Sequence, residues 1–121
     1  MKKILYVEDD KINALIIRKL LQDKYEVEIA PEGQTCLKLV KQNTYDLILM
    51  DINLGNDQMD GVKTREEVRK LLGAKSPQIV AVTAFAMPED QAKFLKLGFD
   101  AYISKPIEEN MLQALLNRLF K

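Results

Sequence analysis

The sequence predicts an α/β domain in which a five-stranded parallel sheet is covered by five helices, a doubly wound arrangement with helices on both faces. Short apolar runs alternate along the chain with segments of helical periodicity, which is the order expected of strand-helix units. Continuous apolar runs begin at Ile4, Leu47 and Ile79, as in strands buried on both faces. At 121 residues the chain fits one domain, and we expect it to span residues 1–121 with no output domain.

In the first half of the chain, the apolar pattern changes period several times. A helical pattern begins at Ile12, with a central apolar stripe and further apolar residues that widen it. Tyr25–Ile29 alternates polar and apolar residues, as in an edge strand covered on one face. The apolar stripe of the helix consists of Ile12, Ile16 and Leu20, widened by Leu15, Ile17 and Leu21. The elements expected here are the strand Lys3–Val7, this helix, the strand Tyr25–Ile29, a helix ending near Gln42 and the strand Tyr45–Met50.

The second half begins with a loop, Asp51–Asp60, that is longer than the usual ~4 to 6 residues, and such loops are more often functional. Gly73 is a plausible C-cap for the helix before it, and Pro88 suits a first helical position. We expect Val62, Val68, Leu71 and Leu72 to face inward on one helix, and Met111, Leu112, Leu115, Leu116, Leu119 and Phe120 on another. The expected elements are the helix Gly61–Leu72, the strand Gln78–Val82, a helix from Pro88 to near Gly98, the strand Asp100–Ile103 and the helix Glu108–Phe120.

The strand order follows from which strands need covering on both faces. The three continuous apolar runs require interior positions, whereas the second strand and the short fifth strand suit the edges. Among doubly wound orders, 2-1-3-4-5 satisfies this directly. It places the first and third strands side by side.

Composition excludes several classes of function. Lys plus Arg and Asp plus Glu both total 18, so no bulk charge favours nucleic acid or an anionic membrane. No apolar run reaches the length of a signal sequence or a membrane span, and we expect a cytoplasmic protein. The single cysteine, Cys36, fits a buried apolar position in a reducing compartment. Histidine is absent, which excludes Ser-His-Asp triads and His-ligated zinc, so a bound metal must have oxygen ligands.

Acidic residues follow the first and third strands. Because those strands are neighbours, Glu8 and Asp9 come next to Asp51 at the carboxyl edge of the sheet. Two carboxylates about 4 Å apart repel by roughly 4 kcal/mol at an effective dielectric constant of about 20. A hard divalent cation would neutralise them, and Mg²⁺ with several waters and a phosphate oxygen suits so few protein ligands. The competing interpretation, that Asp9 or Asp10 only caps the first helix, is favoured for Asp10 alone.

Polar residues also follow the fourth and fifth strands. Thr83 offers a hydroxyl, and Lys105 offers an ammonium held in an extended segment by Pro106. Taken alone, Thr83 fits a helix cap and Lys105 a solvated loop residue. Together with a metal beside Asp51, they form a cradle for the three oxygens of a phosphoryl group.

The motifs ILYVEDD, LILMDINL, MDG, VAVTAFAM and AYISKPI, in this order, resemble the receiver domain of two-component response regulators across the whole chain. The resemblance implies a CheY-like fold in which Asp51 accepts a phosphoryl group from a phosphohistidine. It implies that Mg²⁺ is bound by Asp9, Asp51 and the backbone carbonyl of Asn53, with Glu8 acting through water. Lys105 would contact the phosphoryl group, and Thr83 and Tyr102 would be the switch pair.

Within that family, Asn13 and the run ending in GFDAYISKPI are most similar to receivers of hybrid histidine kinases and single-domain DivK-type regulators. This implies a phosphorelay with a histidine kinase or histidine phosphotransfer domain, and an output surface on the fourth helix, fifth strand and fifth helix. We expect a monomer or weak homodimer, and Met1 and Lys121 as termini favour a free-standing regulator. Asn53 and Phe85 offer no acid or base to activate water, which predicts slow self-dephosphorylation. The segment Leu54–Gln58 departs from the family's shorter MPxMDG pattern.

Three other functions share parts of this pattern. A haloacid-dehalogenase-like phosphatase also uses an Asp nucleophile, but it needs a second Asp where this chain has Asn53. A flavodoxin-type cofactor binder needs a hydroxyl- and glycine-rich phosphate loop, where this chain has the acids that begin at Glu8. A receiver-like adaptor that is never phosphorylated is the third alternative.

Overall fold

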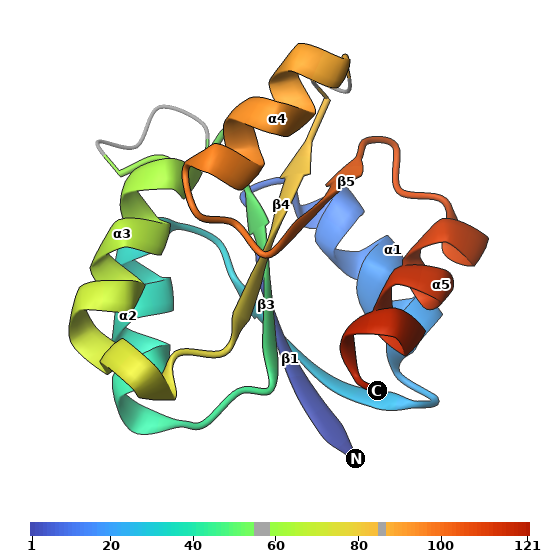
Figure 1. The fold of residues 1–121 in the computed structure, drawn as a ribbon. Coiled ribbons are helices and arrows are strands. Elements are labelled where there is room, and N and C mark those ends of the chain that lie inside the picture. The colour runs from blue at the N-terminus through green and yellow to red at the C-terminus, as the bar shows by residue number, and fades with distance from the viewer. Residues whose placement is uncertain (55–58, 85–86) are drawn as a thin grey trace.

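A computed structural model of the chain describes residues 1–54, 59–84 and 87–121. Its parallel sheet has five strands in the order β2-β1-β3-β4-β5, as the sequence predicts, with helices on both faces (Figure 1). The elements are β1 (Lys2–Val7), α1 (Lys11–Leu21), β2 (Tyr25–Ala30), α2 (Gly33–Gln42), β3 (Leu47–Asp51), α3 (Gly61–Leu72), the 3₁₀ turn η1 (Gly73–Lys75), β4 (Gln78–Thr83), α4 (Pro88–Lys96), β5 (Ala101–Ser104) and α5 (Glu109–Leu119).

The register of the sheet determines which residues meet at its carboxyl edge. β1 pairs with β3 so that Val7 lies opposite Met50, and β3 pairs with β4 so that Asp51 lies opposite Val82. On the outer side of β4, Thr83 lies opposite Ser104 of β5. The residues that follow β1, β3, β4 and β5 are therefore delivered to one edge.

Two apolar clusters hold the sheet between its helices. Side chains alternate between the two faces of a strand, so β1 and β3 contribute to both clusters. One cluster packs against α2, α3 and α4, and includes Leu5, Val7, Cys36, Val40, Ile48, Met50, Val68 and Phe94. The other packs against α1 and α5, and includes Ile4, Tyr6, Ile17, Leu21, Leu47, Leu49, Leu112 and Leu116.

The predicted apolar stripe of α1 is wrong in part. The helix is buried through Ala14, Ile17 and Leu21, which recur at helical spacing. Ile12 and Ile16 lie away from this buried face and are 70% and 48% exposed. Ala14 is small enough to bring α1 close to the sheet, so the helix packs through the face that contains it. The exposed residues leave an apolar surface on α1.

Two further side chains predicted to face inward are exposed, Leu71 on α3 and Met111 on α5. Each lies at the margin of its helix's apolar stripe, where the sheet no longer covers it. The predicted caps are confirmed: the Asp10 carboxylate accepts hydrogen bonds from the backbone N–H groups of Ile12 and Asn13, and Gly73 ends α3 with a φ of 56°. In the part of the chain that the structure describes, every helix is too short or too polar to cross a membrane.

Candidate phosphoacceptor and metal site

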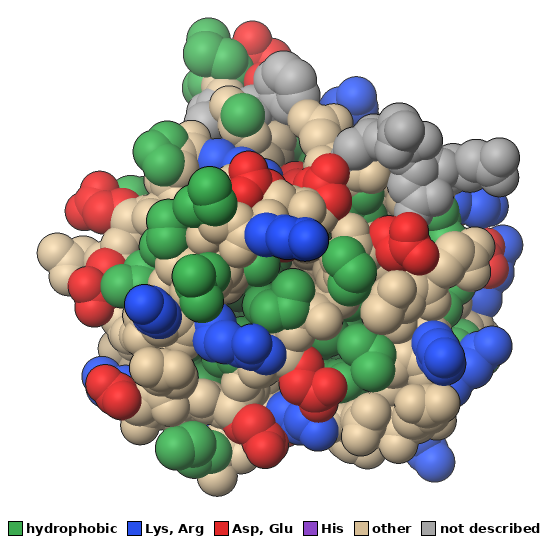
Figure 2. All heavy atoms as spheres, turned by 180° about the vertical axis from the view of Figure 1, so that it is seen from behind, with side chains coloured by type: hydrophobic (Ala, Val, Ile, Leu, Met, Phe, Trp, Pro, Cys, Tyr) green, Lys and Arg blue, Asp and Glu red, His purple; other side chains and the backbone are tan. Residues whose placement is uncertain are grey.

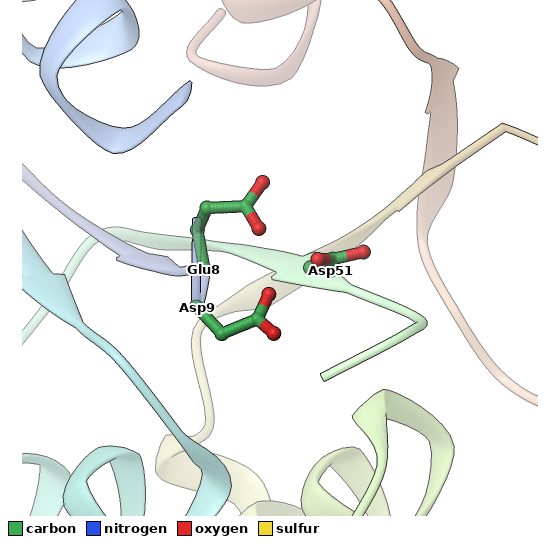
Figure 3. A group of neighbouring side chains, drawn as sticks. All are labelled: Glu8, Asp9 and Asp51. Atoms are coloured by element: carbon green, nitrogen blue, oxygen red, sulfur yellow. The ribbon is translucent and has the colours of Figure 1, made fainter. Parts of the chain in front are cut away.

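Three carboxylates converge at the carboxyl edge of the sheet. Glu8 and Asp9 follow β1, and Asp51 is the last residue of the neighbouring β3. Figure 3 shows their carboxylates directed toward a shared space. One oxygen from each residue lies within 4.8 Å of the others. The sequence prediction that these three acids meet is confirmed.

Asp51 is almost completely buried, with 2% of its surface exposed. Its Oδ2 accepts a hydrogen bond from Lys105 Nζ at 3.1 Å, and its Oδ1 accepts one from the Asn53 backbone N–H at 3.1 Å. Burial and then the adjacent Glu8 carboxylate raise the pKa of Asp51 to about 7, although Lys105 opposes this increase. Near neutral pH the carboxylate needs a further positive charge to remain fully ionised.

Glu8 is also buried, and protein donors surround its carboxylate. Its Oε1 accepts hydrogen bonds from the Tyr6 hydroxyl at 2.8 Å and from Lys105 Nζ at 2.9 Å. Its Oε2 accepts a 3.3 Å hydrogen bond from the Asp10 backbone N–H. Burial raises the pKa of Glu8, but its interactions with Asp51, Lys105 and Tyr6 outweigh burial, and the net pKa is lowered. Glu8 therefore carries the negative charge that Lys105 balances.

Asp9 is the exposed member of the group. Partial desolvation, followed by its interaction with Glu8, raises the pKa of its carboxyl group. When ionised, the three carboxylates and the Lys105 ammonium together carry a net charge of −2. That charge and the all-oxygen ligand set fit a hard dication such as Mg²⁺, which keeps several of its waters.

Of the remaining predicted site residues, Thr83 lies at the carboxyl end of β4 and Tyr102 lies on the neighbouring β5. Thr83 ends β4, is buried, and its carbonyl accepts a 2.8 Å hydrogen bond from the Lys105 backbone N–H. Tyr102 lies on β5, two residues before Ser104, and its hydroxyl donates to Gln91 Oε1 of α4 at 2.5 Å. Tyr102 is half-buried and packs against the cluster under α4. Phe85 and the segment 55–58 of the departing loop lie outside the described residues.

Backbone hydrogen bonds join the start of the loop after Asp51 to β4 and the start of α3 to the loop. The Ile52 N–H donates to the Val82 carbonyl at 3.0 Å, and the Gly61 N–H donates to the Ile52 carbonyl at 3.1 Å. Gly61 lies so close to the Asp51 backbone that a Cβ at this position would overlap the Asp51 carbonyl. The absent side chain of Gly61 is thus what allows α3 to begin beside the candidate phosphoacceptor.

Tyr6 touches the site, and sequence reasoning missed it. Its apolar ring made it look like an ordinary core residue of β1. The available signal was the two-residue spacing to Glu8, which places both side chains on the same face of the strand.

An apolar groove of about 380 Å³ lies beside the site, between α1 and the segment after β5. It is lined by Asn13, Ile16, Ile17, Lys105, Pro106 and Ile107, among others. Hydrophobic side chains are exposed among charged ones on the back of the molecule (Figure 2). On α1, which begins two residues after Asp9, the exposed apolar side chains are those of Ile12, Leu15 and Ile16.

With this geometry established, comparison with known proteins identifies the family. A family model described as the response regulator receiver domain matches residues 4–117. The chain belongs to the response regulator receiver family. As a receiver it is of the phosphoacceptor class that acts in two-component phosphorelays, and the comparisons give no support to the phosphatase or adaptor alternatives.

Its curated relatives include hybrid sensor kinases from bacteria and eukaryotes. The chain is 37% identical over 116 residues to the signal transduction histidine-protein kinase BarA of Escherichia coli, covering 95% of this chain and 12% of BarA. It is 39% identical over 120 residues to hybrid signal transduction histidine kinase G of Dictyostelium discoideum, covering 96% of this chain and 3% of that kinase. The chain thus spans a small part of the relatives it matches.

Solved receiver structures share the fold. The Vibrio cholerae chemotaxis response regulator CheY4 superposes with a TM-score of 0.88 at 28% identity, covering 98% of each chain. The receiver domain of the sensor histidine kinase PA1611 from Pseudomonas aeruginosa superposes with a TM-score of 0.85 at 31% identity, covering 98% of this chain and 96% of that one. That PA1611 structure is described as having a magnesium ion coordinated in its active-site cleft.

Proposed function

We propose that Asp51 is the phosphoacceptor and that its phosphodonor is a phosphohistidine on a histidine kinase or histidine phosphotransfer domain. The observation that carries this proposal is the buried Asp51 carboxylate, held between the Lys105 ammonium and the Asn53 N–H and flanked by Glu8 and Asp9. The 121 residues contain no histidine, so the donor histidine must lie outside them. The apolar surface of α1 beside the site offers a place for that protein to dock.

The reaction is an in-line transfer at phosphorus. A carboxylate oxygen of Asp51 forms the new P–O bond while the P–N bond to the donor imidazole breaks, and the imidazole nitrogen keeps the bonding electron pair. Lys105 Nζ, which donates to Asp51 Oδ2 before reaction, is positioned to follow the negative charge onto the phosphoryl oxygens. Thr83, at the end of β4, supplies a hydroxyl to the same group.

Mg²⁺ is the cofactor that this proposal assigns to the site. Asp9, Asp51 and the Asn53 carbonyl would bind it directly, and Glu8 through water. When bound, Mg²⁺ neutralises charge on the carboxylates and on the phosphoryl oxygens. The raised pKa of Asp51 and the net charge of −2 both support this assignment.

The output is a change in a protein-binding surface on α4, β5 and α5. A groove of about 660 Å³ lies there, lined in part by Leu95, Tyr102, Met111 and Arg118. The aspartyl phosphate adds about two negative charges, by analogy with side-chain phosphates. Thr83 moves toward the new oxygens and Tyr102 moves inward, leaving the hydrogen bond to Gln91.

The domain does not act as a multiple-turnover enzyme in this proposal. The residue two positions after Asp51 is Asn53, which has no acid or base to activate water or protonate a leaving group. The aspartyl phosphate therefore persists for longer than seconds. A steady-state phosphatase assay that gave many turnovers per chain would favour the phosphatase alternative instead.

The test uses phosphoramidate as a small donor in the presence of Mg²⁺. Wild-type protein should gain one phosphoryl group per chain, and Asp51→Asn should gain none. Asp46→Asn, which changes a carboxylate before β3 at the opposite edge of the sheet, serves as the matched control and should behave as wild type. Equal incorporation by Asp51→Asn and wild type would overturn the proposal.

A further inference from the structure

Tyr6 connects the apolar core to the candidate site. Its ring is fully buried in the cluster beneath α1 and α5, one residue before β1 ends. Glu8 follows two residues later on the same face of the strand, at the carboxyl edge. The Tyr6 side chain is long enough to bring its hydroxyl to Glu8 Oε1, to which it donates at 2.8 Å.

This hydrogen bond is the first link in a chain of polar contacts that ends at Asp51. Glu8 Oε1 accepts from both Tyr6 and Lys105, and Lys105 Nζ then donates to Asp51 Oδ2. Glu8 is 1% exposed, so its carboxylate has little access to water and depends on protein donors. The Tyr6 hydroxyl is fixed because its ring is packed in the core.

We propose that Tyr6 is a positioning residue for phosphoryl transfer: its hydroxyl holds the Glu8 carboxylate, and Glu8 in turn holds the Lys105 ammonium against Asp51. This inference rests on the proposed role of Asp51. It adds a residue that acts through Glu8 and does not itself contact the phosphoryl group. A second consequence concerns the metal. A carboxylate that accepts a hydrogen bond has less charge available for a cation, so the Tyr6 hydroxyl weakens the pull of Glu8 on Mg²⁺.

The substitution Tyr6→Phe removes the hydroxyl and keeps the buried ring. Without its fixed donor, Glu8 can turn, and Lys105 is no longer held at one place beside Asp51. We expect phosphoryl transfer from phosphoramidate at saturating Mg²⁺ to slow by about fivefold, the size associated with losing one typical hydrogen bond. We expect Mg²⁺ to bind about threefold more tightly, because Glu8 then presents more of its charge to the ion.

Tyr45→Phe is the matched control. Tyr45 is also a buried tyrosine, but it lies at the opposite edge of the sheet, and its hydroxyl has no hydrogen-bond partner among the described residues. Loss of this hydroxyl should leave both the transfer rate and the Mg²⁺ dissociation constant unchanged. Circular dichroism of each variant checks that the fold is retained at the temperature of the assays.

A double-mutant cycle with Glu8→Met separates positioning from general destabilisation. Glu8→Met removes both side-chain oxygens that accept these hydrogen bonds, so adding Tyr6→Phe to it should change neither the transfer rate nor the Mg²⁺ dissociation constant further. Calorimetric titration with MgCl₂ gives the dissociation constant without requiring any phosphoryl transfer. It is therefore a readout of the site that is independent of activity.

The outcomes distinguish this proposal from the proposed function. Wild-type protein that neither binds Mg²⁺ nor takes up phosphoryl groups would overturn the function itself. Functional wild-type protein with an unchanged or weaker Mg²⁺ affinity in Tyr6→Phe would overturn only the role of Tyr6. Equal changes in Tyr6→Phe and Tyr45→Phe, or full additivity of Tyr6→Phe with Glu8→Met, would also overturn it.

Discussion

Replacing Asp51 with asparagine should stabilise the metal-free domain above neutral pH. In the folded protein, burial and then the Glu8 carboxylate raise the pKa of Asp51 from 3.8 to about 7. The unfolded chain releases this proton near pH 4, whereas the folded chain keeps it to about pH 7. Between those values the unfolded state binds fewer protons than the folded state, so the free energy of unfolding falls as pH rises.

The size of this effect follows from the difference between the two pKa values. About three pKa units at 1.36 kcal/mol each give an upper value of about 4 kcal/mol, and we expect about 2 to 4 kcal/mol. The asparagine side chain of the variant has no proton to lose, and Lys105 still pairs with Glu8. The variant and the wild type should therefore diverge between about pH 4 and pH 7, with the full difference present above pH 7.

Urea denaturation followed by circular dichroism, with EDTA present, measures the free energy of unfolding at pH 4, 5.5 and 8. Asp23→Asn, at an exposed position after α1, controls for the loss of one acidic charge and should follow the wild type at all three values. Added Mg²⁺ should stabilise the wild type more than Asp51→Asn and reduce the gap. An Asp51→Asn variant no more stable than wild type at pH 8 would refute the electrostatic account of the site.

Three other perturbations test separate parts of the structure. Gly61→Ala places a Cβ against the Asp51 carbonyl and should lower the free energy of unfolding by about 1 to 3 kcal/mol, measured in urea, while also slowing phosphoryl transfer. Lys105→Met removes the cation that contacts Asp51 and should slow transfer from phosphoramidate by at least about a hundredfold, measured at saturating Mg²⁺. Gln91→Met removes the acceptor of the Tyr102 hydroxyl and should shift the Tyr102 ring resonances of the unphosphorylated protein toward their phosphorylated positions in NMR spectra.

For each of these three predictions, one result would contradict it. Gly73→Ala is the comparison for Gly61→Ala, because no atom of the described residues lies within 4 Å of a Cβ at Gly73 and only backbone strain is added. Equal transfer rates in the two glycine variants would show that Gly61 does not position the phosphoacceptor. Wild-type rates in Lys105→Met would remove Lys105 from the mechanism. Unchanged Tyr102 resonances in Gln91→Met would mean that the hydrogen bond does not bias the switch.

The sequence predicted the meeting of Glu8, Asp9 and Asp51 because parallel strands bring their carboxyl ends to one edge of the sheet. The strand order, and with it the pairing of β1 with β3, followed from which apolar runs needed covering on both faces. These inferences depend only on periodicity and topology.

Side-chain contacts across the fold were less predictable. Hydrophobicity alone does not tell which of two apolar stripes on α1 packs on the sheet, so Ile12 and Ile16 could not be recognised as exposed from their residue types. The hydrogen bond from Tyr6 to Glu8 depends on how far one ring reaches along the strand, which is a property of the packed core. A residue pattern contains no such distance.

The most direct test of the central claim is to identify the residue that becomes phosphorylated. The chain would be incubated with Mg²⁺ and a phosphorylated histidine phosphotransfer domain, reduced with borohydride to trap the acyl phosphate, and digested for mass spectrometry. The account predicts one modified site, at Asp51 in the peptide that contains LILMDINL, and its loss when Mg²⁺ is chelated. Modification at Glu8, Asp9 or any other residue, with Asp51 unmodified, would contradict it.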